Sequence, residues 1–354
     1  MDADAWFTEA MATAHALLDA EEPQAWQVTT LTGTGGGTFG ESVVSRFDSP
    51  RGTAIVKIVK RNGVESDHPL SWRRELDIYN SEWLRSRLPT GLRLPDCLGS
   101  ATTDDAAVIV VADVPFDDPL ARDVAWYGDL AALLARLSAC VADDSTVPSW
   151  VSRGFLDHEI GLVESAIPDV VERRSPVVDE VIDVWRPLLE RVGPVGAQLV
   201  DALHSLPVGL NHLDAFSRNA ARVGDHFVMI DWAYAGLAPV GCDAASLIAI
   251  TAMAREVPAG DLDSLREAVT TGYASGLASG GVRVPVEQLD FAIDVALTLR
   301  FVGFLTQIHR GGDNIAAMVE AISGRPFSEA RSTWTAMAHY LTPAGQRALA
   351  SVGA

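Results

Sequence analysis

Cysteine is scarce in this sequence, and no two cysteines are close enough to suggest a redox motif or a shared metal ion. Cys97, Cys140 and Cys242 lie far apart in a chain of 354 residues. This spacing excludes C-x-x-C chemistry and a scaffold stapled by disulfides. We therefore expect buried, reduced thiols in a cytoplasmic protein.

Basic side chains and long apolar runs are also few. The chain has 27 Lys and Arg against 47 Asp and Glu, a formal net charge of −20, which disfavours a nucleic-acid partner because phosphates attract basic residues. No apolar stretch approaches the ~20 residues that cross a bilayer, and the acidic N-terminus is unlike a signal peptide. We expect neither a nucleic-acid nor a membrane partner. Surface acid would suit a cationic small substrate, although solubility alone explains it equally well.

The first third of the chain is rich in strand patterns around a glycine-rich loop. A leading helix and three strands are predicted over 6–18, 26–31, 41–47 and 54–59. Gly35, Gly36, Gly37 and Thr38 lie between the first two strands. A dinucleotide-binding loop would open a helix, whereas the residues that follow here are β-branched. We interpret the loop as a hairpin tip over phosphates, as in protein kinases, and the alternative is a flexible hairpin without a ligand.

Lys57 stands inside the third strand, which is otherwise apolar. A buried ammonium needs a partner, and the following helix, with an apolar stripe from Trp72 to Leu84, carries Glu75 near that stripe. A lysine of the third strand and a glutamate of the next helix form the ion pair that positions nucleotide phosphates in kinases. The alternatives are a lysine that reaches water and a solvated glutamate. The succession of the two residues favours the ion pair.

Two further strands are predicted over 94–98 and 107–111, and the second ends shortly before a proline that follows Val114. Beyond this point the patterns become helical, so we predict an N-terminal nucleotide-binding lobe over 1–113 and a helical lobe over 114–354. The backbone from Val111 through Asp113 to Val114 would offer a purine its hydrogen-bonding edge. The sequence has no internal repeat.

Two carboxylates and one amide lie within a short span of the second lobe. Asp214, Asn219 and Asp231 are flanked by short predicted strands over 208–210 and 227–230. Carboxylate and amide oxygens suit a hard divalent cation, and one carboxylate is left to handle a proton. The span therefore predicts a metal site beside a proton acceptor.

These motifs together resemble the aminoglycoside phosphotransferase family, small-molecule kinases related to protein kinases. The likeness extends from Trp26 to about Leu247. The family's His-x-Asp-x-x-x-x-Asn pattern, its Ile-Asp-Trp and its Gly…Pro…Asp tail are matched in turn by His212, Asp214 and Asn219, by Ile230, Asp231 and Trp232, and by Gly236, Pro239 and Asp243.

The resemblance implies an α+β, two-lobed, protein-kinase-like fold. It has an N-terminal antiparallel five-stranded sheet with one main helix, and a mostly helical C-terminal lobe. By resemblance, Asp214 orients the substrate hydroxyl and accepts its proton, and Asn219 and Asp231 hold Mg²⁺ on the phosphates of ATP or GTP. Lys57, fixed by Glu75, contacts the α- and β-phosphates.

Two further residues receive structural roles from the same resemblance. His212 would be a hydrogen-bonding residue of the loop, and Asp243 would bond the backbone of the catalytic loop. Three positions depart from the family, since Leu213 stands where many members have Gly, Ala112 where an acidic residue is frequent, and Ser138 where His is frequent. None of these changes removes a metal ligand or the base.

The function implied is a Mg²⁺-dependent transfer of the γ-phosphate of ATP or GTP to a hydroxyl of a small molecule. An aminoglycoside or another antibiotic or secondary metabolite is the expected substrate class, which would make the protein a resistance enzyme. The alternatives are a kinase of a primary metabolite (an amino sugar, a choline-like amine or homoserine) and a catalytically silent nucleotide-binding protein of the same fold. A Rossmann oxidoreductase would rest on the glycine loop alone.

Overall fold

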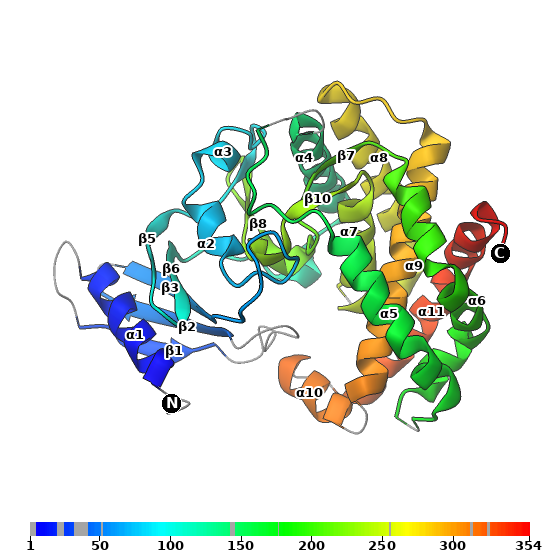
Figure 1. Ribbon diagram of the computed structural model, residues 1–354, viewed down its shortest axis with the longest axis horizontal. Helices are drawn as coiled ribbons and strands as arrows, with labels where there is room; N and C mark the ends of the chain where they lie inside the picture. The colour runs from blue at the N-terminus through cyan, green and yellow to red at the C-terminus, as the bar shows by residue number, and fades with distance from the viewer. Residues whose placement is uncertain are drawn as a thin grey trace. The chain divides into compact units, whose positions relative to one another are not determined.

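The computed structural model describes residues 5–19, 25–31, 42–50, 52–141, 146–175, 177–254, 256–311, 314–323 and 326–354. The chain divides into two compact units (Figure 1). Unit 1 comprises Met1–Asp117, Pro148–Ser152 and Asn219–Ala235. Unit 2 comprises Asp118–Val147, Arg153–Arg218 and Gly236–Ala354.

Unit 1 is built on an antiparallel five-stranded sheet in the order β1-β2-β3-β6-β5, as predicted. Its strands are β1 (Gln27–Thr30), β2 (Ser42–Ser49), β3 (Gly52–Lys60), β5 (Cys97–Thr102) and β6 (Ala106–Ala112). A second, three-stranded sheet in this unit contains β4 (Leu92–Arg93), β8 (Ala220–Val223) and β9 (His226–Met229). In the five-stranded sheet the central strands β3 and β6 are rich in valine, isoleucine and alanine, and β6 is buried along almost its whole length.

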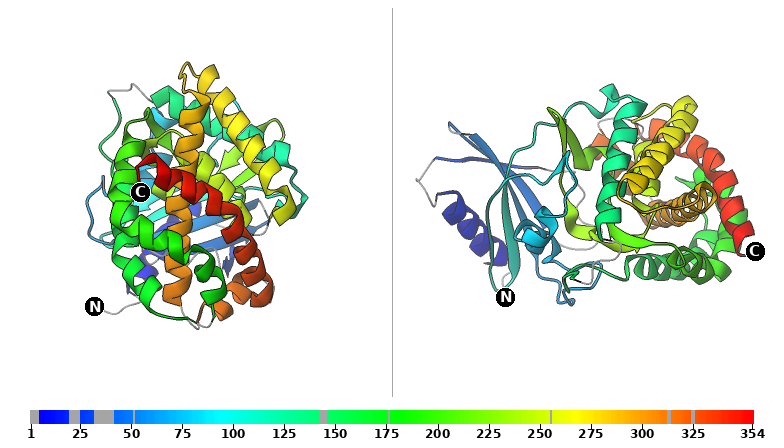
Figure 2. Two further views of the ribbon diagram at one scale, coloured as in Figure 1. Left: turned by 90° about the vertical axis from the view of Figure 1, so that its right-hand side faces the viewer. Right: turned by 90° about the horizontal axis from the view of Figure 1, so that it is seen from above.

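Helix α1 (Ala5–Leu18) covers one face of the five-stranded sheet (Figure 2, right). Its small residues Ala10 and Ala14 are fully buried against Val56, Ile58 and other residues of the central strands. Side chains of a strand alternate between its two faces. Lys57 therefore projects from the face opposite α1.

The helix predicted from Trp72 to Leu84 is broken in the structure. It consists of α2 (Arg74–Tyr79) and α3 (Glu82–Arg85). Ser81 between them is extended, and its hydroxyl accepts a hydrogen bond from the backbone N–H of Leu84 at 3.3 Å. A serine cap starts a new helix here, and the continuous apolar stripe concealed this interruption.

Unit 2 is mostly helical, with one two-stranded sheet of β7 (Val208–Asn211) and β10 (Gly236–Pro239). The helices are α4 (Val124–Val141), α5 (Phe155–Glu172), α6 (Asp179–His204), α7 (Cys242–Met253), α8 (Leu262–Ser279), α9 (Val286–Gly311), α10 (Asn314–Ser323) and α11 (Phe327–Ser351). Helix α9 packs against α5, α6, α7 and α11 (Figure 2, left). It therefore forms the centre of the helical core.

Helical spacing in the sequence predicts two helices over 177–192 and 195–206, divided near Gly193, and the structure corrects this to the single helix α6. It continues through Pro187 and Pro194 as one helix, with a buried stripe from Val181 to Leu203. A proline inside a helix removes one hydrogen bond and costs about 3 kcal/mol. Burial of the apolar stripe on both sides of each proline offsets this cost.

Two of these helices, α4 and α9, are long and apolar enough to cross a bilayer by length and composition alone. However, 56% of the apolar stretch of α4 and 72% of that of α9 are buried inside the protein. Such burial is typical of core helices.

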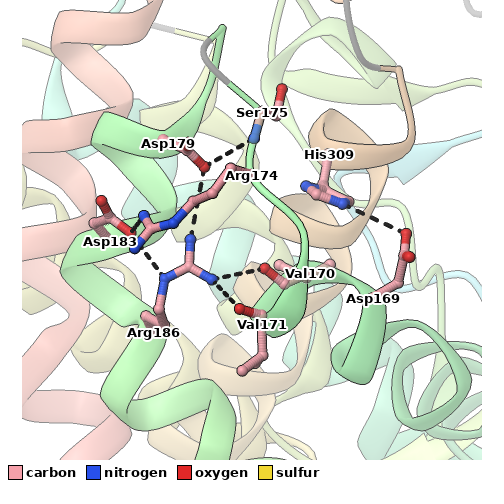
Figure 3. A network of polar contacts seen from close by, with 9 residues as sticks. All are labelled: Asp169, Val170, Val171, Arg174, Ser175, Asp179, Asp183, Arg186 and His309. Atoms are coloured by element: carbon pink, nitrogen blue, oxygen red, sulfur yellow. Dashed lines mark hydrogen bonds and ion pairs between the residues drawn. The ribbon is translucent and has the colours of Figure 1, made fainter.

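A polar network connects the end of α5 to α6 (Figure 3). Arg186 of α6 donates through Nη1 to the carbonyl oxygens of Val170 and Val171, at 2.8 and 2.6 Å, while its Nε contacts Asp183 at 2.8 Å. Asp183 also pairs with Arg174. The last carbonyls of a helix lack partners within it, so Arg186 caps α5 from the neighbouring helix.

Strand β7 leads into the predicted catalytic loop and lies very close to α4. A Cβ atom at Gly209 would lie 2.2 Å from the carbonyl oxygen of Ser138, a distance that no side chain tolerates. Only glycine permits such an approach of two backbones. The pairing of β7 with β10 and this contact together fix where the strand ends at Asn211.

Candidate active site

In unit 1 the structure brings together three charged residues that sequence analysis predicted for the site. The Nζ atom of Lys57 lies 2.6 Å from Glu75 Oε2 and 2.6 Å from Asp231 Oδ1. Glu75 is 5% exposed, so its carboxylate is largely removed from water. The ion pair expected between strand β3 and the following helix is present, and Asp231 joins it.

The electrostatics of this cluster are dominated by burial and by mutual attraction. Burial lowers the pKa of Lys57, but the nearby Asp231 and Glu75 carboxylates more than offset this effect, so that its pKa is raised. Burial raises the pKa of Glu75, Lys57 opposes the rise, and Asp231 adds to it. One ammonium faces two carboxylates, and the excess negative charge would favour a further cation nearby.

Asn219 and Asp231 meet at the open end of the hairpin formed by β8 and β9. The register pairs Ala220 with Met229, and the backbone N–H of Ile230 donates to the carbonyl oxygen of Asn219 at 2.9 Å. The hairpin therefore brings an amide and a carboxylate that are twelve positions apart to the same end of the two strands. Asp231 itself has φ 59° and ψ 60°, a left-handed conformation that residues other than glycine rarely adopt.

These oxygen donors fit a magnesium ion held mainly by nucleotide. The part of the chain that the structure describes contains no group of three or more His, Cys, Asp or Glu side chains arranged for a metal. Mg²⁺ is usually bound through one or two carboxylates together with substrate phosphates, rather than by a cage of protein ligands. Asp231 with Asn219 matches the first arrangement.

An apolar surface lies beside Lys57 on the same face of the sheet. Cross-strand pairing places Val44 and Ile109 next to Lys57, and Val111 next to Ile55. Ile109 and Val111 are buried, at 2% and 9% exposure. Such a surface suits the flat face of a purine, because ligand sites are commonly lined by apolar side chains with a few polar groups.

Backbone amides after Val111, which sequence analysis assigned to a purine, already form hydrogen bonds within the protein. The amides of Ala112 and Asp113 donate to the carbonyls of Asp96 and Thr53, at 2.9 and 3.4 Å. A purine edge would therefore meet carbonyl oxygens of this segment and the amide of Val114. The carboxylate of Asp113 lies 3.2 Å from Arg46, a strand β2 residue that sequence analysis did not single out.

The glycine-rich loop, with Gly35, Gly36, Gly37 and Thr38, lies outside the described residues. Its contact with phosphates stays a prediction. A separate cavity of about 360 Å³ in unit 1 is lined by residues of the β3–α2 connection and the β5–β6 turn, including Arg61, Trp72 and Thr103. It contains none of the predicted site residues.

In unit 2 a buried carboxylate holds the backbone of the predicted catalytic loop. Asp243 is fully buried and accepts hydrogen bonds from the amides of His212 and Leu213, at 2.9 and 2.8 Å. Burial raises the pKa of Asp243 to about 6, although the two amides and Arg300 act to lower it. Asp214, the predicted proton acceptor, follows this anchored pair directly and is partly exposed.

The backbone of Leu213 has a conformation that favours glycine, the residue that many family members have at this position. Its φ is 63°, in the left-handed region where glycine is free of strain. The leucine side chain is 1% exposed. The loop therefore keeps the backbone shape that glycine would favour, and burial of the leucine offsets the strain.

Three further residues support this loop and were missed by sequence analysis. Arg122 donates to the carbonyl oxygen of Ser217 at 2.5 Å and lies 4.1 Å from the Trp126 ring centre. Arg218 pairs with Glu256 at 2.9 Å, and the Glu256 side chain is 1% exposed. Arg122 and Ser217 are 95 positions apart, so no local pattern could have connected them.

Comparison with known proteins gives one family match. A family model described as the phosphotransferase enzyme family matches residues 39–282, which is more than half of the chain. No curated protein sequence matches the chain at a significant level.

Solved structures of small-molecule kinases share the fold. Amicoumacin kinase hAmiN, solved with AMP-PNP, Ca²⁺ and Ami, has a TM-score of 0.58 at 15% identity, covering 92% of this chain and 93% of its own. A choline/ethanolamine kinase family protein from Mesorhizobium loti has a TM-score of 0.56 at 14% identity, covering 97% and 99%. An aminoglycoside phosphotransferase from Alicyclobacillus acidocaldarius has a TM-score of 0.51 at 14% identity, covering 92% and 91%. Identities this low establish the two-lobed, protein-kinase-like fold alone.

Proposed function

The chain belongs to the phosphotransferase enzyme family and is a small-molecule kinase, and we propose that it transfers the γ-phosphate of ATP or GTP, with Mg²⁺, to a hydroxyl. The observation that carries this proposal is the cluster of Lys57, Glu75 and Asp231, joined by two contacts of 2.6 Å. Phosphoryl transfer depends on alignment and charge neutralisation more than on covalent chemistry. This cluster supplies a fixed cation and an anionic metal ligand side by side.

Each predicted residue has a defined task in the proposed reaction. Asn219 and Asp231 would hold Mg²⁺, which when bound supplies positive charge to the nucleotide phosphates. Lys57, with Glu75 as its partner, would contact the α- and β-phosphates, and the loop of Gly35, Gly36, Gly37 and Thr38 would cover them. The apolar surface near Val111 would receive the base.

Asp214 would orient the acceptor hydroxyl and take its proton. The hydroxyl oxygen then forms a bond to the γ-phosphorus, the bond from that phosphorus to the bridging oxygen breaks, and the nucleoside diphosphate leaves. Hydrogen bonding of the preceding backbone to Asp243, with two amides at 2.9 and 2.8 Å, supports a fixed position for Asp214. Fixed geometry of this kind supplies a large share of the rate in such reactions.

The acceptor we propose is a cationic antibiotic or amino alcohol. The net charge of −20 supports a cation, and structural relatives include an amicoumacin kinase and a choline/ethanolamine kinase family protein. If the acceptor is an antibiotic, the protein confers resistance. The three cysteines, which form no disulfide, support a cytoplasmic location.

A pair of matched substitutions tests the division of roles. In Asp214→Asn we expect turnover to fall on the order of 10³-fold, because the proton acceptor is lost, while binding of Mg²⁺ and ATP is retained. In Asp231→Asn we expect metal-dependent nucleotide binding itself to weaken. The measurements are release of nucleoside diphosphate with a panel of aminoglycosides, amino sugars and amino alcohols, and titration calorimetry with ATP and GTP.

Two results would overturn the proposal. Parent-like turnover of Asp214→Asn with a true substrate would remove Asp214 from its role. Metal-dependent nucleotide binding by the parent, with no phosphorylated product across the panel, would instead favour a catalytically silent nucleotide-binding protein.

A further inference from the structure

Arg74 is a fully buried arginine next to Glu75 on α2, and its guanidinium binds backbone carbonyls from three separate segments of unit 1. Its donors reach the carbonyl oxygens of Ser66 at 3.4 Å, His68 at 2.5 Å, Pro69 at 2.6 Å, Trp150 at 3.2 Å and Ala233 at 3.1 Å. The first three belong to the connection before α2. The fourth belongs to the Pro148–Ser152 segment, and the fifth follows the metal ligand Asp231.

This environment is costly for a cation. Burial lowers the pKa of Arg74 to about 10, although Asp67 and Asp77 act to raise it. The groups that contact the guanidinium are neutral carbonyls and not carboxylates. A buried charge is rarely the most stable solution for a protein core, since apolar residues of similar volume often stabilise it more. A role beyond packing is therefore worth testing for Arg74.

The role of Arg74 can be inferred from its bond to the carbonyl of Ala233. Ala233 lies two residues after Asp231, in a segment with backbone strain. Asp231 has φ 59°, and a left-handed residue other than glycine costs about 1 kcal/mol or more. Arg74 binds the carbonyl of Ala233, and Glu75 accepts a hydrogen bond from the backbone N–H of Trp232. Two consecutive residues of α2 thus bind the first and the third peptide groups that follow Asp231.

The indole of Trp232 holds the same segment from its other side. Its Nε1 donates to the carbonyl oxygen of Met229 at 2.9 Å, and the side chain is fully buried. A segment held at both ends keeps its strained residue in one conformation. The Cα–Cβ direction of Asp231 is then set by its backbone, and Lys57, 2.6 Å from Oδ1, holds the carboxylate itself.

We propose that Arg74 is a positioning residue, which fixes the Asp231 carboxylate for the metal by binding the carbonyl of Ala233. This inference rests on the proposed function, because it takes Asp231 as a metal ligand. Lysine cannot replace arginine here, since a single ammonium has three donors at one point whereas the planar guanidinium has five donors in a fixed fork. If Arg74 only filled space, its replacement by lysine would lower the stability of the protein without changing its Mg²⁺ requirement.

The test compares Arg74→Lys and Arg74→Gln with Arg73→Lys. Arg73 is the preceding residue, its side chain is 47% exposed, and it contacts Asp77 at 3.3 Å. ATP binding is titrated with and without Mg²⁺, and thermal unfolding of each variant is recorded. We expect both Arg74 variants to need about 10- to 100-fold more Mg²⁺ for the same effect on ATP binding, the range seen when residues that orient metal ligands are changed. Metal-free ATP binding and all properties of Arg73→Lys should stay near those of the parent.

The outcomes separate this inference from the proposed function. If Mg²⁺ does not strengthen ATP binding in the parent, the metal role of Asp231 is wrong and the proposed function fails. If Mg²⁺ strengthens it equally in the parent and in the folded Arg74 variants, only the role of Arg74 is wrong. If neither Arg74 variant folds while Arg73→Lys does, Arg74 is required for folding, and its specific effect on the metal site is likewise refuted.

Discussion

Two residues other than glycine adopt a left-handed backbone in the part of the chain that the structure describes, and one lies in each unit. Leu213, with φ 63°, precedes the predicted base Asp214 in unit 2. Asp231, with φ 59°, is itself a predicted metal ligand in unit 1. Strained residues often cluster where function requires one exact geometry. Here each strained residue adjoins or supplies a group of the proposed reaction.

The two strained residues are held by buried charges of different kinds. A carboxylate, Asp243, accepts the amides of His212 and Leu213. At Asp231 the support comes from α2, where Arg74 binds a carbonyl and Glu75 accepts an amide. A charged group makes stronger hydrogen bonds to backbone than a neutral one. In both units a buried charge therefore keeps a strained loop in the conformation that the chemistry requires.

Among the substitutions that test how the two strained residues are held, Asp243→Asn is expected to have the largest effect. An asparagine can accept only one of the two amides through its oxygen, and its NH₂ group faces the other donor, which leaves a buried donor unsatisfied at a cost of about 1–3 kcal/mol. We expect turnover to fall about 100-fold, since a shift of the loop near 1 Å is enough for such a loss. Steady-state kinetics at saturating nucleotide measures this effect.

A matched control is Asp294→Asn. Asp294 is a buried carboxylate of α9 that pairs with Arg266 of α8 at 2.7 Å and with Arg347 of α11 at 2.6 Å. Its loss should lower stability by a similar amount while turnover per folded molecule stays near that of the parent. Equal losses of turnover in both variants would mean that Asp243 acts only through stability.

The difference in stability between the parent and Asp243→Asn should depend on pH, because the pKa of Asp243 is raised. Burial places it at about 6, against an ordinary value of 3.8. Between these values the native state binds the proton more strongly than the unfolded chain does, so this group makes the protein less stable as pH rises from about 4 to 6. The stability of the parent relative to Asp243→Asn should therefore decrease over this interval and be constant above it. Unfolding by denaturant at several pH values measures the difference, and a rise over the interval would contradict the assignment.

Sequence reasoning was most successful where two local patterns follow each other closely. The apolar strand around Lys57 and the helix with Glu75 are separated by a short connection, so an ion pair could be expected from their order alone. The hairpin that joins Asn219 to Asp231 was predicted only in part, since β9 was expected over 227–230 and β8 was not expected. The antiparallel sheet and the helical second half were also evident, since strand and helix periodicities differ clearly.

What sequence reasoning missed depends on contacts between distant parts of the chain. Arg74 stands beside a predicted site residue, yet its bond to the carbonyl of Ala233 spans 159 positions. A backbone carbonyl carries no side-chain signature, so no residue type could reveal it. Two helix boundaries were missed for a related reason. A serine cap divides α2 from α3, and α6 continues through two prolines, because burial in the fold decides whether such local signals end a helix.

Arg186 offers a second arginine that binds carbonyls, without a strained residue nearby (Figure 3). It caps α5 through Val170 and Val171 and is also paired with Asp183. In Arg186→Lys we expect a loss of about 1–2 kcal/mol, as for one or two hydrogen bonds, and an unchanged Mg²⁺ requirement. Chemical unfolding and the Mg²⁺ titration of ATP binding measure the two quantities.

A control on the same helix is Arg191→Lys. Arg191 is exposed and donates to the carbonyl oxygen of the C-terminal Ala354 at 2.6 Å. Exposed contacts of this kind contribute little, so its stability should stay within about 0.5 kcal/mol of the parent. If Arg186→Lys raised the Mg²⁺ requirement as much as Arg74→Lys, the distinction between an arginine at the site and one at a helix end would be lost.

The smallest effect concerns the backbone strain at Leu213 itself. Leu213→Gly and Leu213→Ala both remove a buried side chain, but only glycine also removes the left-handed strain of about 1 kcal/mol. At Leu210, which is equally buried in β7 and has no positive φ, glycine should be less stable than alanine by about 0.5–1 kcal/mol. At Leu213 we expect this order to disappear or reverse. Free energies of unfolding for the four variants test it, and a glycine penalty of the same size at both positions would show that Leu213 carries no strain.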